Sequence, residues 1–450
     1  MWGTPLVVLL MGGGVFFFFY SRFTQFIHFG HAINVLRGKY DDPTEKGEIN
    51  HYQALSTHLA ATVGMGNISG VALAILAGGP GAIFWMWVSA LFGMATKFFT
   101  NTLAIMYRGK DSLGELQGGP MYVIREGLSR SWYWLAILFS VAGMVGVLPI
   151  FQANQLTQVI HDVVLVPLNI GDTYFETAWF NFRISDLVTG IVLTVIVTVV
   201  VYGGVKRIGI VAGNLVPIMV VIYFITVITI IGLHIDKVIP MLSLIITDAF
   251  TGEAVAGGVV GSVILIGAQR AAFSNEAGIG TAPMAHGAAK TDEPVREGLV
   301  AMIGPAIDTL VVCTLTALAI LITDTWVDTS GEGVSVTIEA FNNGIPYGGY
   351  ILAIAAFIFA LTSLFSLSYY GEKCYSFLFG AKHKKQYIMI YIATIIIGSI
   401  ASLKAIVSLI DGMYATMAIP TMISALLLSP KVVKEMKSYF KRMKDLDVRH

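Results

Sequence analysis

Long apolar runs separated by short polar stretches dominate the sequence. A transmembrane helix needs about 20 mostly apolar residues, and eleven segments meet that need. They are 4–20, 53–77, 81–107, 132–161, 185–203, 207–233, 255–288, 297–323, 348–371, 386–403 and 405–428. None alternates with the period of two that a membrane β-barrel requires. The pattern therefore predicts an all-α polytopic membrane protein with about 11 transmembrane helices.

Two of these segments are interrupted at their middle by small and polar residues. In 53–77 they are Gly64, Gly66, Asn67, Ser69 and Gly70, and in 255–288 they are Ser274, Asn275, Glu276, Gly278, Gly280 and Pro283. Without the first helix, the interrupted segments open two halves of five helices each. An odd number of helices inverts the second half, and paired broken helices in inverted halves indicate a transporter's midplane site. The predicted units are residues 1–52 (extra helix and cytoplasmic segment), 53–233 and 254–428 (repeats), and 429–450 (basic tail).

Charge is scarce and unevenly distributed. Charged residues make up 12% of the 450 positions, and 28 basic residues balance 28 acidic ones. The low charge excludes a disordered chain, and without a basic excess nucleic acid is not an expected partner. Of the 28 Lys and Arg, 23 fall in one set of loops and three in the opposite set. The positive-inside rule then predicts a cell (plasma) membrane protein with its N-terminus outside and its C-terminus in the cytoplasm.

Four charged residues fall inside predicted spans. They are Lys97, Arg270, Glu276 and Asp308. Their charges sum to zero, which is consistent with pairing among them. An intramembrane carboxylate is functional by default, so Glu276 is either a coupling residue or the structural partner of Arg270 or Lys97. The two cysteines, Cys313 and Cys374, lie in or beside apolar segments and show no metal-binding spacing.

The first interruption has a composition that suits an amino acid carried with Na⁺. Each glycine weakens a helix by about 1 kcal/mol. Unwinding there frees carbonyls that can replace the hydration shell of Na⁺, and amides that attract a carboxylate. Helix packing through small residues is the alternative, but packing does not need Asn67 and Ser69. The candidate substrate-binding residues are Gly64, Met65, Gly66, Asn67, Ile68, Ser69 and Gly70.

The second interruption adds further candidates for the same site. They are Phe273, Ser274, Asn275 and Gly278, with Gln152 from the segment 132–161. A buried Gln152 amide could form a hydrogen bond with the amino group of a substrate, or it could form a hydrogen bond with a neighbouring helix. Thr362 and Ser363 place adjacent hydroxyls in the middle of an apolar helix. They could be hard oxygen ligands for a cation, or they could bond back to carbonyls one turn earlier.

Several longer stretches resemble the alanine or glycine:cation symporter family (sodium:alanine symporters). They are Gly78-Gly79-Pro80-Gly81-Ala82-Ile83-Phe84-Trp85, Gly93-Met94-Ala95-Thr96-Lys97-Phe98, Gly64–Gly70, Phe273–Gly278 with Ala282-Pro283, and Gly304-Pro305 with Asp308-Thr309. The resemblance extends from about residue 53 to 430. It implies a leucine-transporter-like fold, a 5+5 inverted repeat preceded by one extra helix, and no enzymatic activity.

The resemblance also implies a Na⁺ site and a substrate class. Carried over residue by residue, the carbonyls of Ala60, Val63 and Phe359 and the hydroxyls of Thr362 and Ser363 would bind Na⁺ as the coupling ion. The substrates would be small amino acids, chiefly alanine and glycine, and the partners would be that substrate and the lipid bilayer, with no obligatory protein partner. The alternatives are an intramembrane enzyme, for which the sequence has no HExxH or GxSxG motif, a channel, and a related symporter with another substrate or with H⁺ coupling through Glu276.

Overall fold

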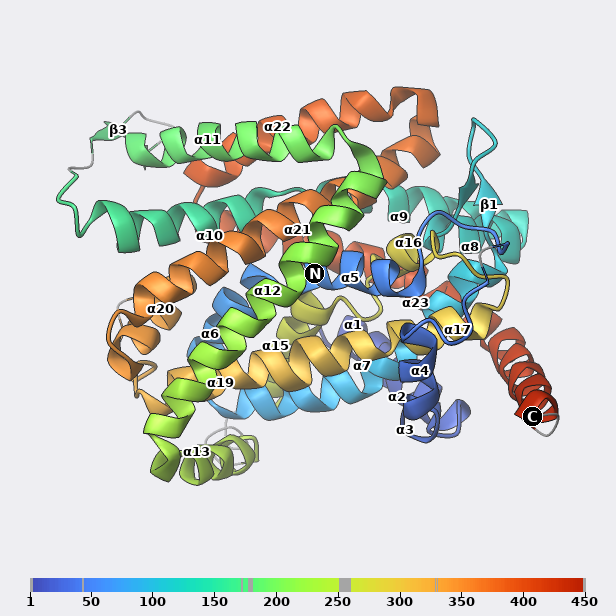
Figure 1. Ribbon diagram of the computed structural model, residues 1–450, viewed down its shortest axis with the longest axis horizontal. Helices are drawn as coiled ribbons and strands as arrows, with labels where there is room; N and C mark the ends of the chain where they lie inside the picture. The colour runs from blue at the N-terminus through green and yellow to red at the C-terminus, as the bar shows by residue number, and fades with distance from the viewer. Residues whose placement is uncertain are drawn as a thin grey trace.

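The computed structural model describes residues 3–42, 44–170, 173–176, 181–250, 260–327, 329 and 331–447. The described chain is mostly helical, and its long helices run roughly along the long axis of the molecule (Figure 1). Two short antiparallel ribbons, β1 with β2 and β3 with β4, connect helices. The prediction of a helical bundle is therefore confirmed.

The elements of the first part of the chain lead from the N-terminal helices to the first half of the bundle. They are α1 (Thr4–Val7), η1 (Val8–Gly12), α2 (Gly13–Tyr20), α3 (Thr24–Ile27), α4 (Phe29–Leu36), α5 (His51–Thr62), α6 (Met65–Gly78), α7 (Gly81–Met106), β1 (Gly109–Lys110), β2 (Leu116–Gln117), α8 (Pro120–Gly127), η2 (Arg130–Trp132), α9 (Tyr133–Gly146), α10 (Ile150–Ile160), η3 (His161–Leu165), β3 (Tyr174–Glu176), β4 (Asn181–Arg183), α11 (Ile184–Val201), α12 (Gly204–Leu233) and α13 (Ile235–Asp248).

The second part of the chain begins with the other interrupted segment. Its elements are α15 (Val260–Asn275), α16 (Ala282–His286), α17 (Pro294–Ala301), α18 (Ile303–Pro305), η4 (Ala306–Cys313), α19 (Thr314–Ile322), α20 (Val334–Gly344), α21 (Gly348–Phe379), η5 (Ala381–His383), α22 (Lys384–Ile400) and α23 (Leu403–Asp447).

Seven described helical runs are long and apolar enough to cross a membrane, and the bent pair α5–α6 makes an eighth. The other predicted spans are helical but shorter. They are Pro5–Tyr20, α15 with 16 residues and α22 with 17. The start of the predicted span 255–288, residues 255–259, lies outside the described residues. The total of eleven spans and the inverted repeat therefore stay predictions.

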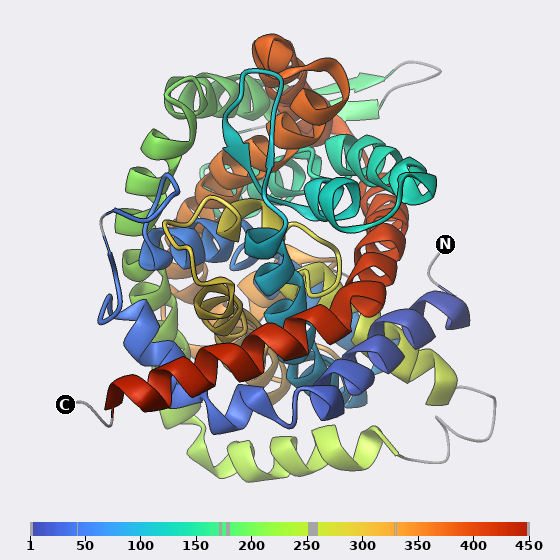
Figure 2. The same ribbon diagram turned by 90° about the vertical axis from the view of Figure 1, so that its right-hand side faces the viewer.

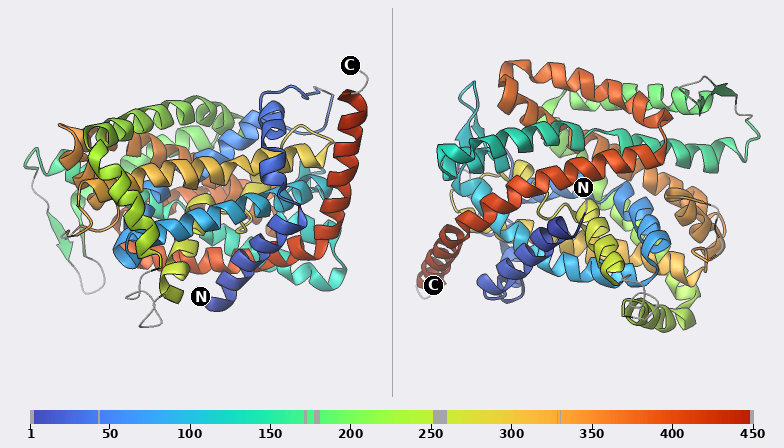
Figure 3. Two further views of the ribbon diagram at one scale, coloured as in Figure 1. Left: turned by 90° about the horizontal axis from the view of Figure 1, so that it is seen from below. Right: turned by 180° about the vertical axis from the view of Figure 1, so that it is seen from behind.

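The C-terminal part of α23 crosses one end of the bundle, roughly at right angles to the long helices (Figures 2 and 3). There it lies beside the N-terminal helices. The Thr24 hydroxyl contacts the Met436 sulfur at 3.2 Å, and His31 bonds to the Tyr439 hydroxyl at 2.7 Å. The first and last helices of the chain are thus joined at one end of the molecule.

Replacing Gly267 with alanine should destabilise the bundle, because α15 lies against α7 at this point. A Cβ atom on Gly267 would lie 2.5 Å from the Trp85 Cβ and 2.7 Å from the Ala82 carbonyl oxygen, and such overpacking costs about 1–3 kcal/mol. We expect a lower melting temperature for detergent-purified Gly267→Ala. Gly213→Ala, a site on α12 with no atom within 4 Å of the new Cβ, is the control and should not melt lower. Equal melting of the two variants would contradict the close packing.

Candidate functional site

The first break lies between α5 and α6, whose axes bend by 43°. Val63 is extended (φ −75°, ψ 91°) and Gly64 follows with φ −156° and ψ −149°. The Gly64 amide donates to the Asn67 side-chain oxygen at 2.8 Å, and the Asn67 amide donates to the Gly64 carbonyl at 3.1 Å. The amides of Met65 and Gly66 begin α6 and have no preceding helical turn to supply acceptors. A Cβ on Gly64 would overlap the Ser363 hydroxyl. Gly64 is therefore needed for the close approach of α21.

The second break follows α15 and contains three left-handed residues: Glu276 (φ 56°), Gly278 (φ 83°) and Gly280 (φ 105°). The two glycines adopt this conformation without strain, whereas a side chain such as that of Glu276 rarely does. The Glu276 carboxylate is buried and accepts bonds from the hydroxyls of Thr281 and Tyr414, the latter at 2.9 Å. At the second break, two hydroxyl groups therefore stabilise the buried Glu276 carboxylate.

Of the two alternatives for Glu276, the structural pair with Arg270 or Lys97 is not among the ion pairs of the described residues. Arg270 bonds to Asp411 at 2.7 Å, and the Lys97 amine contacts the His58 ring. The predicted set of four buried charges is also incomplete, because Glu297, Lys373 and Asp411 are buried too. The sequence does not show which face of a helix meets which neighbour, and this determines the partner of each charge.

Asp308, on η4, connects the two breaks. Its carboxylate accepts bonds from the Asn67 amide at 2.7 Å, from the Ser274 hydroxyl at 2.7 Å and from the Thr309 hydroxyl at 2.8 Å. Asn67 also donates to the Ser274 hydroxyl at 3.1 Å. Asn67 belongs to the first break and Ser274 to the second, so a single buried carboxylate ties both together.

A small cavity lies between the two breaks. It is lined by Ala61, Thr62, Gly66, Gly146, Leu148, Phe151, Gln152, Phe273, Glu276, Leu367, Ile410 and Tyr414. The Phe273 ring packs edge-on against Phe151, with centroids 5.0 Å apart. The Gln152 side-chain oxygen is buried and has no hydrogen-bond partner among the described residues. The cavity thus offers an apolar wall, a carboxylate and an unused amide oxygen.

Three of the substrate-site candidates line this cavity: Gly66, Gln152 and Phe273. The others lie around it. Asn67 and Ser274 bond to Asp308, Asn275 bonds to Thr309, and Ser69 bonds to Gln155. Gly64, Met65, Ile68 and Gly70 form the backbone at and after the first break, and Gly278 packs against Leu10 and Met422. Sequence reasoning did not identify Thr62, Phe151 or Tyr414, which no motif marks.

The candidate cation ligands gather where α5 ends beside α21. The Ser363 hydroxyl donates to the Ala60 carbonyl at 3.0 Å. The Phe359 carbonyl is also close to Gly64, since a Cβ atom added to this glycine would lie 3.7 Å from the carbonyl oxygen. The Thr362 hydroxyl bonds back to the Ile358 and Phe359 carbonyls, both at 3.0 Å. Val63 is the extended residue that follows α5. Carbonyl and hydroxyl oxygens form a donor set that suits a hard cation.

Two interrupted helices that meet at a buried polar cavity, within a bundle of membrane-crossing helices, define a secondary transporter. The family model for the sodium:alanine symporter family matches residues 1–449, so the chain belongs to this family. Its members are transporters and not enzymes.

Named relatives and a solved structure agree with this assignment. The chain is 40% identical to the sodium/alanine symporter AgcS of Methanococcus maripaludis, over 98% of this chain and 95% of the relative. It is 34% identical to the probable sodium/glutamine symporter GlnT of Bacillus subtilis, over 99% and 89%. The structure resembles MhsT in complex with L-phenylalanine, with a TM-score of 0.63 at 13% identity over 85% of this chain and 90% of that one. The leucine-transporter-like fold is confirmed.

Replacing Asp308 with asparagine should weaken the connection between the two breaks. The amide cannot accept all three hydrogen bonds, and bonds to a charged group contribute about 1.5–3 kcal/mol each. We expect a clearly lower melting temperature for Asp308→Asn. Asp324→Asn is the control, because Asp324 is a largely exposed partner of Lys237 and such pairs contribute about 0–1 kcal/mol. If both variants melt alike, Asp308 does not hold the breaks together.

Proposed function

We propose that the chain is a secondary active symporter that imports small neutral amino acids, alanine and glycine, together with Na⁺ by alternating access. The observation that carries the proposal is the contact of Ser363 with the Ala60 carbonyl, beside the cavity between the breaks. A cation bound there joins α5 to α21 and thereby orders the helix that borders the cavity. Ion binding and substrate binding are coupled in this way.

The substrate in this proposal lies in the cavity lined by Gly66, Gln152 and Phe273. Its carboxylate meets the first amides of α6, where the helix dipole favours negative charge. Its ammonium group meets the unpaired Gln152 oxygen and the backbone around Phe273–Asn275. The Phe273 and Phe151 rings wall this cavity, whose volume is about 10 Å³. The cavity must widen to take an amino acid, and a small side chain needs the least widening. This arrangement supports alanine and glycine as substrates.

The proposal keeps the predicted architecture and orientation. Residues 53–233 and 254–428 are the two inverted repeats, and the basic tail is cytoplasmic. One Na⁺ moving down a potential of 100 mV releases about 2.3 kcal/mol. Because each factor of ten in concentration costs about 1.36 kcal/mol, this free energy supports roughly 50-fold accumulation of the substrate.

A related symporter with another substrate or with H⁺ coupling is the second candidate. The buried Glu276 carboxylate lines the cavity, where it could carry a proton, and one relative is named for glutamine. Radiolabelled amino-acid uptake into proteoliposomes, with Na⁺ and H⁺ gradients imposed separately, distinguishes the two. The main proposal requires alanine uptake that follows the Na⁺ gradient alone.

Removing both hydroxyls with Thr362→Ala/Ser363→Ala should abolish Na⁺-stimulated alanine uptake, because two cation ligands are lost. Ser368→Ala is the matched control. Its buried hydroxyl lies on the same helix and, among the described residues, bonds to the Phe365 carbonyl alone, so uptake should stay near the parent value. An unchanged Na⁺ dependence in the double variant would rule out this ion site.

Enlarging the cavity with Phe273→Ala should admit larger amino acids. We expect leucine or methionine to compete with labelled alanine in this variant and not in the parent. Phe357→Ala removes a partly buried ring from α21 outside the cavity and should leave the competition profile unchanged. If the Phe273 variant keeps the parent's profile, Phe273 does not limit substrate size.

A further inference from the structure

The segment that leads into α5, residues 44–50, lies along the residues that follow the second break. We call it the strap. The Glu48 amide donates to the Ala288 carbonyl at 2.8 Å, the Lys290 amide to Ile49 at 2.6 Å, and the Thr291 amide to Lys46 at 3.1 Å. These backbone bonds join the start of the first broken helix to the end of the second. Separation of α5 from α17 must break them.

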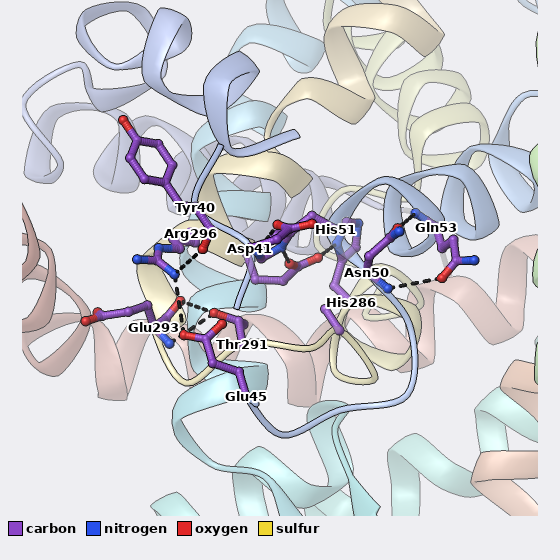
Figure 4. A network of polar contacts seen from close by, with 12 residues as sticks. Tyr40, Asp41, Glu45, Asn50, His51, Gln53, His286, Thr291, Glu293 and Arg296 are labelled. Atoms are coloured by element: carbon purple, nitrogen blue, oxygen red, sulfur yellow. Dashed lines mark hydrogen bonds and ion pairs between the residues drawn. The ribbon is translucent and has the colours of Figure 1, made fainter. Parts of the chain in front are cut away.

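Beneath the strap, three titratable side chains form a buried cluster, and Figure 4 labels two of them, His51 and His286. Glu297 on α17 is fully buried, and its two carboxylate oxygens bond to the Nδ1 atoms of His51 and His286. His51 is the first residue of α5 and His286 is the last residue of α16. The cluster therefore fastens both broken helices to α17, away from the cavity.

With both imidazoles neutral, the cluster carries the single negative charge of Glu297, and one additional proton makes it neutral. A buried carboxylate without a compensating charge is strongly destabilising, so one of the two imidazoles is charged when the strap is closed. His51 is the more favourable site for this positive charge, because its Nε2 lies 3.8 Å from the carboxylate of Asp41, whose side chain is 42% exposed. The His286 ring lies 5.7 Å from the His58 ring, and the His58 ring contacts the Lys97 amine, so among the described residues no carboxylate other than Glu297 is seen to pair with this side of the cluster.

Other charged groups around the cluster have partners of their own. Arg296 bonds to the Tyr40 carbonyl at 2.9 Å and pairs with Glu45 at 3.4 Å. Arg108 donates to carbonyls of Lys46, Gly287, Ala289 and Thr291. Among the described residues, the ion pairs of Glu297 are with His51 and His286. The imidazoles make the direct contacts with this carboxylate, whereas Arg108 interacts with it from a greater distance.

We propose that His51, Glu297 and His286 form a proton site, and that loss of one proton from it releases the strap and α5 from α17. The proton leaves the His51 imidazolium for water beside Asp41, and the cluster changes from neutral to one negative charge. That charge is stable only with water around it, so the closed packing opens. The inference rests on the proposed function, because it assigns this opening to the end of the transporter that carries the basic tail.

Labelling of a cysteine under the strap tests the proposal. Ala289 is fully buried and forms a bridge with Ile49, so Ala289→Cys should react with a maleimide only when the strap opens. The detergent-purified full chain is labelled between pH 6 and pH 9. Ser438→Cys, an exposed position on α23, is labelled in parallel to correct for the pH dependence of thiol reactivity. The native Cys313 and Cys374 are buried, and the unsubstituted chain gives their background.

The corrected labelling rate of the Ala289→Cys parent should rise at least about tenfold between pH 6 and pH 9. After Glu297→Gln the rate should not change with pH, because no buried carboxylate charge is left to neutralise. His51→Asn, which removes the titrating group, should also be flat and provides a second variant. Glu45→Gln is the matched control. Burial raises the pKa of the Glu45 carboxyl above its ordinary value, so Glu45 is the competing titratable group on the strap. This variant should keep the full pH response.

A flat response in the parent, or a full response in Glu297→Gln and His51→Asn, would overturn the proton site. Loss of the response in Glu45→Gln would assign the titration to Glu45 instead. The assay needs neither alanine nor Na⁺. Failure of alanine uptake therefore contradicts the proposed function alone, and a pH-independent rate contradicts the proton site alone.

Discussion

The contact on which the site depends is the carboxylate of Asp308 with the side chains of Asn67 and Ser274. Backbone that leaves a helix inside a membrane must be buried in protein or must line a water-filled space. Each break therefore needs a neighbour that supplies polar partners. Asp308 supplies them to both breaks at once, so the two breaks lie close together and border one cavity. Beside that cavity, Ser363 of α21 contacts the Ala60 carbonyl.

Four of the buried acids in the described part of the chain are stabilised in different ways. Asp308 accepts from neutral amide and hydroxyl groups, Glu276 accepts from Thr281 and Tyr414, Asp411 pairs with Arg270, and Glu297 lies between two imidazoles. These differences matter because only some such environments respond to a proton. An arginine keeps its charge at all physiological pH values, whereas histidine changes charge near neutrality. The arginine pair is therefore the fixed contact, and the imidazole cluster is the adjustable one.

Sequence reasoning located both breaks correctly, because glycines and polar residues stand out within apolar helices. It also brought together Ser363, Ala60 and Phe359 through the family resemblance. It could not give the partners of Glu276, Arg270 and Lys97, since these depend on the rotation of each helix about its axis. Tyr414 carries no local signal, because it reaches the cavity from α23, far along the chain. The short helices α15 and α22 leave the number of spans open.

The contacts of the C-terminal part of α23 with the N-terminal helices have a consequence for biosynthesis. Thr24 and His31 leave the ribosome 412 and 408 residues before Met436 and Tyr439, respectively. Nascent chains fold progressively from the N-terminus as they are made. In this protein α3 and α4 therefore acquire these neighbours only after residue 439 has been made. A chain truncated before Met436 lacks these contacts, and the uncovered surface on α3 and α4 distinguishes it from the 450-residue chain.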